Sequence, residues 1–260
     1  MNFDEALKQA YLANPAQVLP NACWKTSQHI AGSETVFACS ADGKVTRLEL
    51  WQGNRLLAAW DANRSRMGLP AARMESMSFA LLHDDYIGEV GEAQFSSRKA
   101  YFRLTYTYET APRAALLPQG FRFKNVDPDQ EAHLAAALID QCYDDIKPGA
   151  ETVRQWTHLP VFSADLWVWI WDQVGDRPAG LGIAEFDPEI GEGSLEWIQV
   201  LPEYRHKGLG HGLVRELICR LEGRARFVTV SGEMNKLTHP EHLYRTCGFT
   251  GEDVWWVLER

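Results

Sequence analysis

The sequence lacks the patterns that mark secreted, disulfide-bonded or membrane proteins. Its five cysteines are odd in number and scattered, and no two of them form a CxxC pair. Such spacing predicts reduced thiols rather than a disulfide or zinc framework. No uninterrupted apolar run reaches the roughly 18 residues that a membrane span needs, and the N-terminus has acidic residues where a signal peptide would have an apolar core. We therefore expect a soluble, cytoplasmic protein without a membrane partner.

The sequence also lacks the patterns that are typical of metal-binding and nucleic-acid-binding proteins. The eight histidines show no HExxH string or other metal-ligand spacing, which predicts that the protein binds no metal. Acidic residues outnumber basic ones by 35 to 26, and the formal net charge is −9 at pH 7. This balance argues against nucleic acid as a partner. It suits a cationic or amine-bearing ligand, although solubility alone would also explain it.

The chain is long enough for two domains. With 260 residues it exceeds the common size of one compact domain. The segment APRAALLPQG, at 111–120, is rich in proline and glycine and separates two strand-like segments. We therefore predict one domain at 1–117 and a second at 118–260.

The second half alternates between strand and helix patterns. Strands are predicted at 121–126, 166–171, 179–186, 195–200, 225–231 and 253–259, and helices after Asp127 and at 150–156, 209–221 and 241–247. In the first half the predicted elements are a three-stranded meander within 34–62, a helix over about 69–82 and a strand at 100–108. These patterns indicate a mixed α+β protein.

One predicted strand, 166–171, is unusually rich in tryptophan. Trp167, Trp169 and Trp171 alternate along it, and the residues between them are apolar. Both faces are therefore apolar, which predicts a buried strand. Packing in the core is the favoured interpretation, and a tryptophan-lined acceptor pocket that includes Trp197 is the alternative.

The most informative segment is LEWIQVLPEYRHKGLGHGL, at 195–213. A predicted strand leads through Pro202 into a basic, glycine-containing loop that opens directly into a helix. Gly208 and Gly210 can adopt positive φ angles and allow a ligand close to the backbone. The N–H groups at the start of a helix bind phosphate. No GxxxxGKS or GxxxxGKT string occurs, and Leu213 stands where a dinucleotide-binding GxGxxG motif needs its third glycine.

Two motifs together resemble those of the GNAT superfamily of N-acetyltransferases. Arg205, Gly208 and Gly210 fill the pyrophosphate loop of that family, Arg/Gln-x-x-Gly-x-Gly/Ala after a strand, and YRTCGF from Tyr244 is similar to its Tyr-x-x-x-Gly-Phe motif. The resemblance implies the GNAT fold for 118–260, a mostly antiparallel central sheet flanked by helices. The smaller N-terminal α+β domain is either a degenerate GNAT-like copy or unrelated.

The resemblance also implies acetyl-CoA as co-substrate. Asn235 matches by type the asparagine that contacts the cofactor in this family, although it lies farther from Tyr244 than is usual there. The residues expected to bind the cofactor are Ile198, Gln199, Val200, Arg205, His206, Lys207, Gly208, Leu209, Gly210, His211 and Asn235.

Transfer of an acetyl group to an amine also needs proton handling. The attacking amine must be neutral, so a carboxylate that accepts its proton is most useful for aliphatic amines. Glu196 and Glu233 are the first candidates for this base, and Glu185 is the third. The resemblance assigns Tyr244 as proton donor to the leaving thiolate and a backbone N–H near Val200 as donor to the oxyanion. The alternatives are a solvent-facing Glu196, a Glu233 in a loop and a Tyr244 that only packs in the core.

The resemblance thus implies an N-acetyltransferase that acetylates a primary amine of a small molecule or peptide. Direct attack in a ternary complex is expected, because the defining positions of the two motifs include no cysteine or serine nucleophile, and Cys247, beside those of the second motif, is expected to pack. A non-enzymatic acyl-CoA-binding regulatory module and an acyltransferase with a longer acyl donor are the alternatives, and a homodimer is left open. The replacement Gly210→Val is expected to abolish binding of acetyl-CoA and to leave thermal unfolding nearly unchanged.

Overall fold

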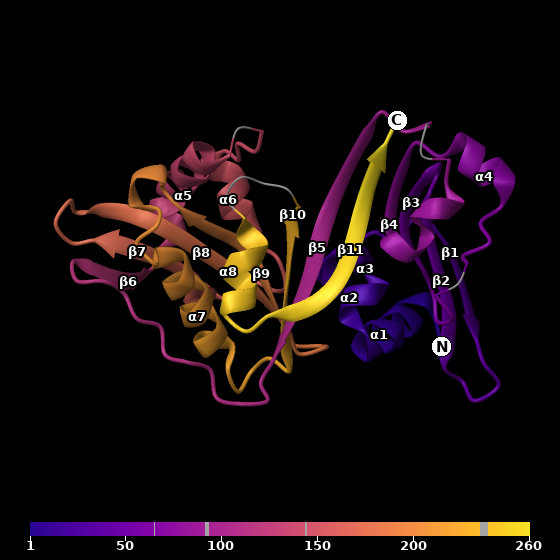
Figure 1. Cartoon of the computed structure of the whole chain (residues 1–260), viewed down its shortest axis with the longest axis horizontal. Helices are drawn as coiled ribbons and strands as arrows, with labels where there is room; N and C mark the ends of the chain where they lie inside the picture. The colour runs from indigo at the N-terminus through magenta and orange to yellow at the C-terminus, as the bar shows by residue number, and fades with distance from the viewer. Residues whose placement is uncertain (65, 92–93, 144, 235–238) are drawn as a thin grey trace. The chain divides into compact units, whose positions relative to one another are not determined.

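The structure, a computed structural model, describes all residues of the chain except 65, 92–93, 144 and 235–238. The chain forms two compact units, whose segments can be followed by colour in Figure 1. Unit 1 comprises Met1–Thr105, Thr229–Glu241 and Thr250–Arg260, and unit 2 comprises Tyr106–Val228 and His242–Phe249. The units group residues by contact and not by chain order, so the predicted boundary after residue 117 stays a prediction.

Unit 2 is built from four strands and the helices that pack on them. Its elements are β6 (Phe121–Asn125), α5 (Pro128–Cys142), α6 (Ala150–Trp156), β7 (Trp167–Asp172), β8 (Arg177–Asp187), β9 (Glu192–Val200), α7 (Leu209–Leu221) and most of α8 (Pro240–Thr246). Strands β6, β7, β8 and β9 pair in this order, each antiparallel to the next. The elements predicted from the sequence between 121 and 221 are all present.

The helix α5 begins where the sequence predicts a helix start. The Asp127 side chain accepts hydrogen bonds from the backbone N–H groups of Asp129 and Gln130, and Pro128 occupies the first turn. A capping carboxylate and an early proline are both favourable at a helix N-terminus. The apolar side of α5 joins the core of unit 2, where Trp167 and Trp169 are buried. Core packing is therefore confirmed for these two tryptophans.

Helix α7 packs on the sheet of unit 2 through glycines. A Cβ at Gly182 of β8 would lie 3.1 Å from Leu213 and Leu217 of α7, and one at Gly193 of β9 would lie 2.6 Å from Leu221. The absence of side chains at these positions lets the helix approach the strands closely. The start of α7 is thereby held beside the end of β9.

The Glu131 carboxylate links α5 to β6 and β7 and gives a prediction about stability. It accepts hydrogen bonds from the Trp169 indole N–H (2.9 Å) and the Asp127 backbone N–H (3.0 Å), and it pairs with Lys124. Glu131→Ala should lower the free energy of unfolding by about 1–3 kcal/mol, because the buried indole N–H loses its acceptor. Chemical denaturation at neutral pH measures this loss.

The pH dependence of the same contribution follows from the pKa of Glu131. Partial burial opposes ionisation of this carboxyl, but the Asp127 N–H, Lys124 and Trp169 outweigh it and lower its pKa. Stabilisation from a lowered pKa is present above the ordinary pKa of the group and is lost as pH falls through the lowered value. The difference between wild type and Glu131→Ala should therefore shrink in acid. A constant difference would contradict the assignment.

Unit 1 combines the N-terminal half of the chain with the C-terminal strand. Its elements are α1 (Phe3–Ala13), α2 (Pro15–Val18), α3 (Cys23–Ser27), β1 (Glu34–Cys39), β2 (Val45–Gln52), β3 (Arg55–Asp61), α4 (Ala71–Ser76), β4 (Phe79–His83), β5 (Ser97–Thr107), β11 (Thr250–Glu259) and most of β10 (Phe227–Glu233). The strand order is β1-β2-β3-β4-β11-β5-β10. The predicted meander is confirmed as β1, β2 and β3, and so is the mixed α+β class with mostly antiparallel strands.

The helix predicted over about 69–82 is wrong over its second part. Only Ala71–Ser76 is helical, and Phe79–His83 forms β4. This segment pairs antiparallel with β11, from Phe79 opposite Glu259 to His83 opposite Trp255. A short apolar run fits a helix or a strand equally well, so the pairing with a distant strand decides its conformation.

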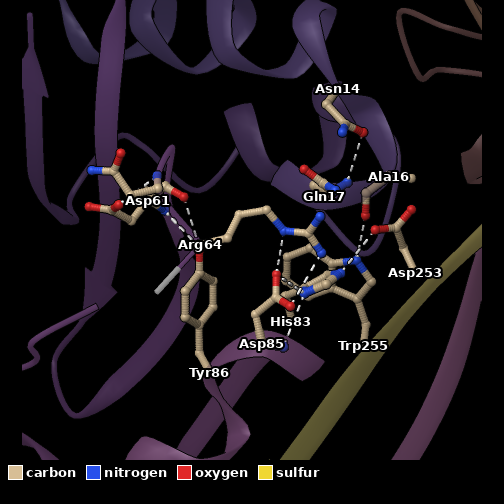
Figure 2. Close-up of polar contacts among 11 residues, drawn as sticks. Asn14, Ala16, Gln17, Asp61, Arg64, His83, Asp85, Tyr86, Asp253 and Trp255 are labelled. Atoms are coloured by element: carbon tan, nitrogen blue, oxygen red, sulfur yellow. Dashed lines mark hydrogen bonds and ion pairs between the residues drawn. The ribbon is translucent and has the colours of Figure 1, made fainter. Parts of the chain in front are cut away.

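A buried polar cluster fixes β11 in unit 1 (Figure 2). The His83 ring is buried, and its Nε2 lies 3.1 Å from Asp253 Oδ1 of β11. Its Nδ1 accepts a hydrogen bond from the Asp85 backbone N–H (3.2 Å), and Arg64 Nε donates to the Asp85 carboxylate (2.7 Å). Trp255 Nε1 donates to the Ala16 carbonyl (2.7 Å). Each buried polar group thus has a partner, and the cluster accounts for the position of the last strand.

Candidate active site

The loop between β9 and α7 has a backbone that suits an anion. Gly208 is the N-cap residue of α7 and lies in the left-handed region with φ 78°, and His206 also has a positive φ, of 61°. No side chain caps α7, and its first turn contains no acidic residue. The N–H groups at this helix start therefore keep their partial positive charge. This is the arrangement that binds a pyrophosphate, so the loop fits the predicted cofactor.

The side chains of Arg205, Lys207 and His211 contact other residues of the protein. Arg205 Nε donates to the Val200 carbonyl at the end of β9 (3.2 Å), and Lys207 Nζ lies 5.0 Å from the centre of the Tyr204 ring. His211 Nε2 lies 2.7 Å from Thr246 Oγ1 of α8. Because Arg205 and His211 contact the protein, the backbone N–H groups are the stronger candidates for phosphate ligands.

The glycines of the loop have different structural roles. A Cβ at Gly208 would meet no atom within 4 Å, whereas one at Gly210 would lie 3.3 Å from Leu243 Cδ2 of α8. Gly210 therefore allows α7 and α8 to pack closely. The replacement Gly210→Val would press on Leu243, so nearly unchanged unfolding is no longer expected. Gly208 is the better position for testing the loop.

A β-bulge in β9 lies at Glu196. Trp197 pairs with Ile183 and Leu195 pairs with Ala184, so Glu196 is an extra residue on this strand. Ser194 and Glu196 are two residues apart and share one face of the strand by alternation. The bulge places Trp197, opposite Ile183, on this face as well.

Glu185 and Glu196 lie close to one hydroxyl group. Ser194 Oγ is 3.0 Å from Glu196 Oε1 and 3.4 Å from Glu185 Oε2. Both carboxylates are partly exposed, and the Ser194 hydroxyl can donate to only one of them at a time. Two neighbouring carboxylates favour a cation beside them. The sequence suggested Glu185 only as the third candidate, and the register that places it opposite Ser194 has no reliable signal in the sequence.

Aromatic side chains lie beside this pair of carboxylates. Trp197 stacks on Trp156 of α6, with ring centres 5.2 Å apart and an angle of 15° between the planes. Tyr143 packs edge-on against Trp197 at 6.0 Å and accepts a hydrogen bond from Gln199 Nε2 (3.1 Å). All three rings are partly exposed. Aromatic faces attract organic cations, so this wall and the carboxylates suit the same kind of group. Sequence reasoning missed Trp156 and Tyr143, which come from other elements.

Tyr244 is a buried residue of α8. It packs edge-on against Phe249 with ring centres 5.8 Å apart. Burial raises the pKa of Tyr244 far above its usual value, and Tyr143, Cys247 and Glu196 raise it further. The hydroxyl therefore keeps its proton at neutral pH and can donate it.

The remaining predicted residues divide between the two units. Ile198 and Val200 pair with Gly182 and Gly180 in β8, on the side of the sheet that faces α7. Glu233 ends β10 and belongs to unit 1. Glu196 belongs to unit 2, and Asn235 lies outside the described residues.

No group of three or more His, Cys, Asp or Glu side chains among the described residues is arranged to hold a metal ion. None of the described helices combines the length and hydropathy of a membrane-spanning segment.

Comparison with known proteins defines the fold and the domain. Residues 163–251 match the family model described as acetyltransferase (GNAT) domain. A GCN5-related N-acetyltransferase from Sphaerobacter thermophilus is similar in structure, with a TM-score of 0.69, 14% identity and coverage of 98% of this chain and 90% of that one. A GNAT-family acetyltransferase from Colwellia psychrerythraea has a TM-score of 0.61, 10% identity and coverage of 100% and 97%.

A tandem GNAT protein from the clavulanic acid biosynthesis pathway is also similar, with a TM-score of 0.55, 15% identity and coverage of 99% and 96%. No match was found among curated proteins. The comparisons thus define a mixed α+β protein with the GNAT fold, as the two sequence motifs predicted. More particularly, residues 163–251 match a GNAT acetyltransferase domain.

Proposed function

We propose that the protein is an acetyl-CoA-dependent N-acetyltransferase that acetylates a primary amine of a small molecule or peptide. The observation that supports this most is that one unit carries an uncapped helix start, at Gly208, a buried tyrosine, Tyr244, and a partly exposed carboxylate, Glu196. The first suits the phosphates of the donor, and the other two suit proton transfer to and from the reacting groups.

The donor would be held by backbone groups. The N–H groups at the start of α7, from Gly208 to His211, would bind the pyrophosphate, and the end of β9 at Ile198–Val200 would contact the rest of the molecule. When bound, acetyl-CoA supplies the acetyl group as a thioester. Arg205 keeps this loop on the end of β9 through its bond to Val200.

Glu196 would accept the proton of the amine. An aliphatic amine with a pKa of about 10.4 is neutral in roughly one molecule in 2,500 at pH 7, so removal of its proton limits the reaction. Glu196 is partly exposed and lies beside the aromatic wall of Trp197, Trp156 and Tyr143. An ammonium group between the rings and the carboxylates would be attracted by both.

Direct attack by the amine remains the expected route. Cys247 is the cysteine nearest to Tyr244 in the sequence, and burial raises the pKa of its thiol to about 11. Because the thiolate is the nucleophilic form, Cys247 is poorly suited to carry the acetyl group at neutral pH. Tyr244, which keeps its proton, would donate it to the leaving sulfur.

Unit 1 would not hold a second donor. Its strands β3 and β4 are parallel, are joined through α4 and pair at only two positions. Before α4, the Glu89 carboxylate accepts hydrogen bonds from the backbone N–H groups of Met67 and Gly68 (2.9 Å for Gly68). A carboxylate of the chain thus occupies N–H groups of the kind that would bind phosphate. This supports the interpretation of the N-terminal half as a degenerate GNAT-like copy.

A thiol-release assay with acetyl-CoA tests the proposal. We expect turnover with at least one class among aliphatic amines, amino acids, aminoglycosides and peptide N-termini. Glu196→Gln should lower kcat/KM by about 10- to 100-fold at neutral pH, and the loss should shrink at high pH because more of the amine is already neutral. Glu216→Gln, which removes a carboxylate paired with Arg220 on α7, is the matched control.

The alternatives give different results in the same assay. Binding of acetyl-CoA without thiol release from any acceptor would favour the non-enzymatic acyl-CoA-binding module. Faster release from a donor with a longer acyl chain than from acetyl-CoA would favour the other acyltransferase. An unchanged kcat/KM in Glu196→Gln would remove this residue from the mechanism.

A further inference from the structure

Unit 2 contains a cavity of about 300 Å³ at the end of α8 that the proposed reaction does not use. Its walls come from the segment 106–113, from Arg215 and Ile218 of α7, and from the residues 245–248. The lining includes neither the start of α7, where the donor would bind, nor Glu196, the proposed base. The size is at the lower limit of small-molecule sites.

The charged side chains that line this cavity are all cationic. They are Arg113, Arg215 and Arg245, and the lining contains no aspartate or glutamate. Arg215 is partly buried, and neither Arg113 nor Arg215 has an ion-pair partner among the described residues. Because like charges repel each other, Arg113 and Arg215 beside one cavity favour an anion between them. The chain as a whole carries a net charge of −9, so the cluster is a local reversal of sign.

The titratable groups of the lining add no negative charge at neutral pH. Burial raises the pKa of Cys247 to about 11, and Arg215 lowers it only in part. Burial also raises the pKa of Tyr106, with smaller contributions from Cys219 and Glu222. Glu222 is an exposed residue outside the lining, so solvent screens its charge.

The walls of the cavity are fixed by contacts within unit 2. Tyr108 donates a hydrogen bond to the Ile218 carbonyl (3.0 Å), and the Tyr106 ring packs on Tyr108 at 5.2 Å and on Phe249 at 5.6 Å. Gly248 has φ 101°, and a Cβ there would lie 3.1 Å from the Tyr106 ring. The cavity is therefore formed before any ligand arrives, which lowers the cost of binding.

We propose that this cavity is a binding site for a small organic anion that carries phosphate or carboxylate groups. Guanidinium groups bind both kinds of oxyanion through charge-assisted, often bidentate hydrogen bonds. Thr110 supplies a hydroxyl donor in the same lining, and Tyr106 and Pro112 supply an apolar surface for a carbon skeleton. The ligand would connect α7, α8 and the segment 106–113. The inference uses only the cavity and does not depend on the reaction proposed above.

Calorimetric titration with citrate and with inorganic phosphate, at low ionic strength, tests this site. We expect one of these probes to bind with a Kd below about 1 mM, and Arg215→Gln and Arg113→Gln each to weaken the binding by about 5- to 10-fold. Tighter binding of citrate would indicate a carboxylate ligand, and tighter binding of phosphate a phosphorylated one. Arg122→Gln removes an equally exposed charge from β6, outside the lining, and should change the affinity less than about twofold.

Three results would overturn the proposal. They are no binding of either probe, an equal loss in Arg122→Gln and the cavity variants, and loss of binding in Gly208→Val or under saturating coenzyme A. The last result would place the anion at the donor loop. Arg113 is exposed, so its replacement should not affect folding, and thermal unfolding of each variant checks this. Because calorimetry needs no turnover, the outcome is independent of whether an amine is acetylated.

Discussion

Replacing Gly208 with valine is expected to weaken binding of acetyl-CoA at least about 100-fold, which corresponds to about 2.7 kcal/mol. Gly208 has φ 78° and ψ 3°, in the left-handed region. A β-branched residue is a clear outlier there. The loop would have to change its backbone to remove the strain, and the N–H groups of the α7 start would then point elsewhere. Each charge-assisted hydrogen bond lost to phosphate costs about 1.5–3 kcal/mol. Isothermal titration calorimetry measures the affinity directly.

Gly223 provides the matched control for this experiment. It follows α7, has φ 74°, and a Cβ there would meet no atom within 4 Å, as at Gly208. The same strain thus arises at the other end of the helix, away from the loop. Gly223→Val should lower the melting temperature about as much as Gly208→Val and leave the affinity unchanged. If both variants bind acetyl-CoA like the wild type, the donor does not bind at this loop.

The donor loop could be predicted because its signals are local. A strand, a short loop with two glycines and a helix follow one another within about twenty residues, and the bounds of α7 agree with the predicted 209–221. The packing role of Gly210 could not be predicted, since it depends on Leu243 of another helix. The motif therefore located the site but did not separate a glycine needed for backbone conformation from one needed for packing.

The acceptor side depends on contacts between distant segments. Glu185 and Glu196 meet at Ser194 because the register of β8 and β9 puts Glu185 opposite Ser194, on the face that Glu196 also shares. Trp156 and Tyr143 reach Trp197 from helices that precede the strand by many residues. Register and bulges have no reliable local signal. The sequence therefore indicated which carboxylates are candidates for the base, but not that Glu185 and Glu196 lie together.

The division of the chain into units also depends on pairing between distant segments, which local patterns do not predict. Every strand of 121–200 could be predicted from local patterns in the sequence, and each pairs with a strand that is its neighbour in the chain. In contrast, β4 and β5 both pair with β11, which lies more than a hundred residues away. The misassigned helix at 79–82 and the position of the C-terminal strand are two results of this single long-range pairing. The buried cluster around His83 and Asp253 explains why the pairing is stable.

The second large effect is expected for Tyr244→Phe, which should lower kcat by about 100- to 1,000-fold and leave the Kd for acetyl-CoA nearly unchanged. Phenylalanine fills almost the same volume in the buried site, so only the hydroxyl is lost. The raised pKa means that the wild-type hydroxyl stays protonated well above neutral pH. The kcat of the wild type should therefore show no decline from ionisation of this tyrosine between about pH 7 and 9, below its ordinary pKa of about 10. Thiol release under saturating donor, across this range, measures both expectations.

Tyr108→Phe separates loss of a proton donor from loss of a buried hydroxyl. Burial raises the pKa of Tyr108 as well, and its hydroxyl donates to the Ile218 carbonyl at 3.0 Å. This variant should lose stability and keep its kcat, because no role in the reaction is assigned to Tyr108. Tyr244→Phe should show the opposite pattern, with a lower kcat at a nearly unchanged melting temperature. Equal kcat values for Tyr244→Phe and the wild type would leave Tyr244 as a packing residue, and the proton for the leaving sulfur would then have to come from solvent.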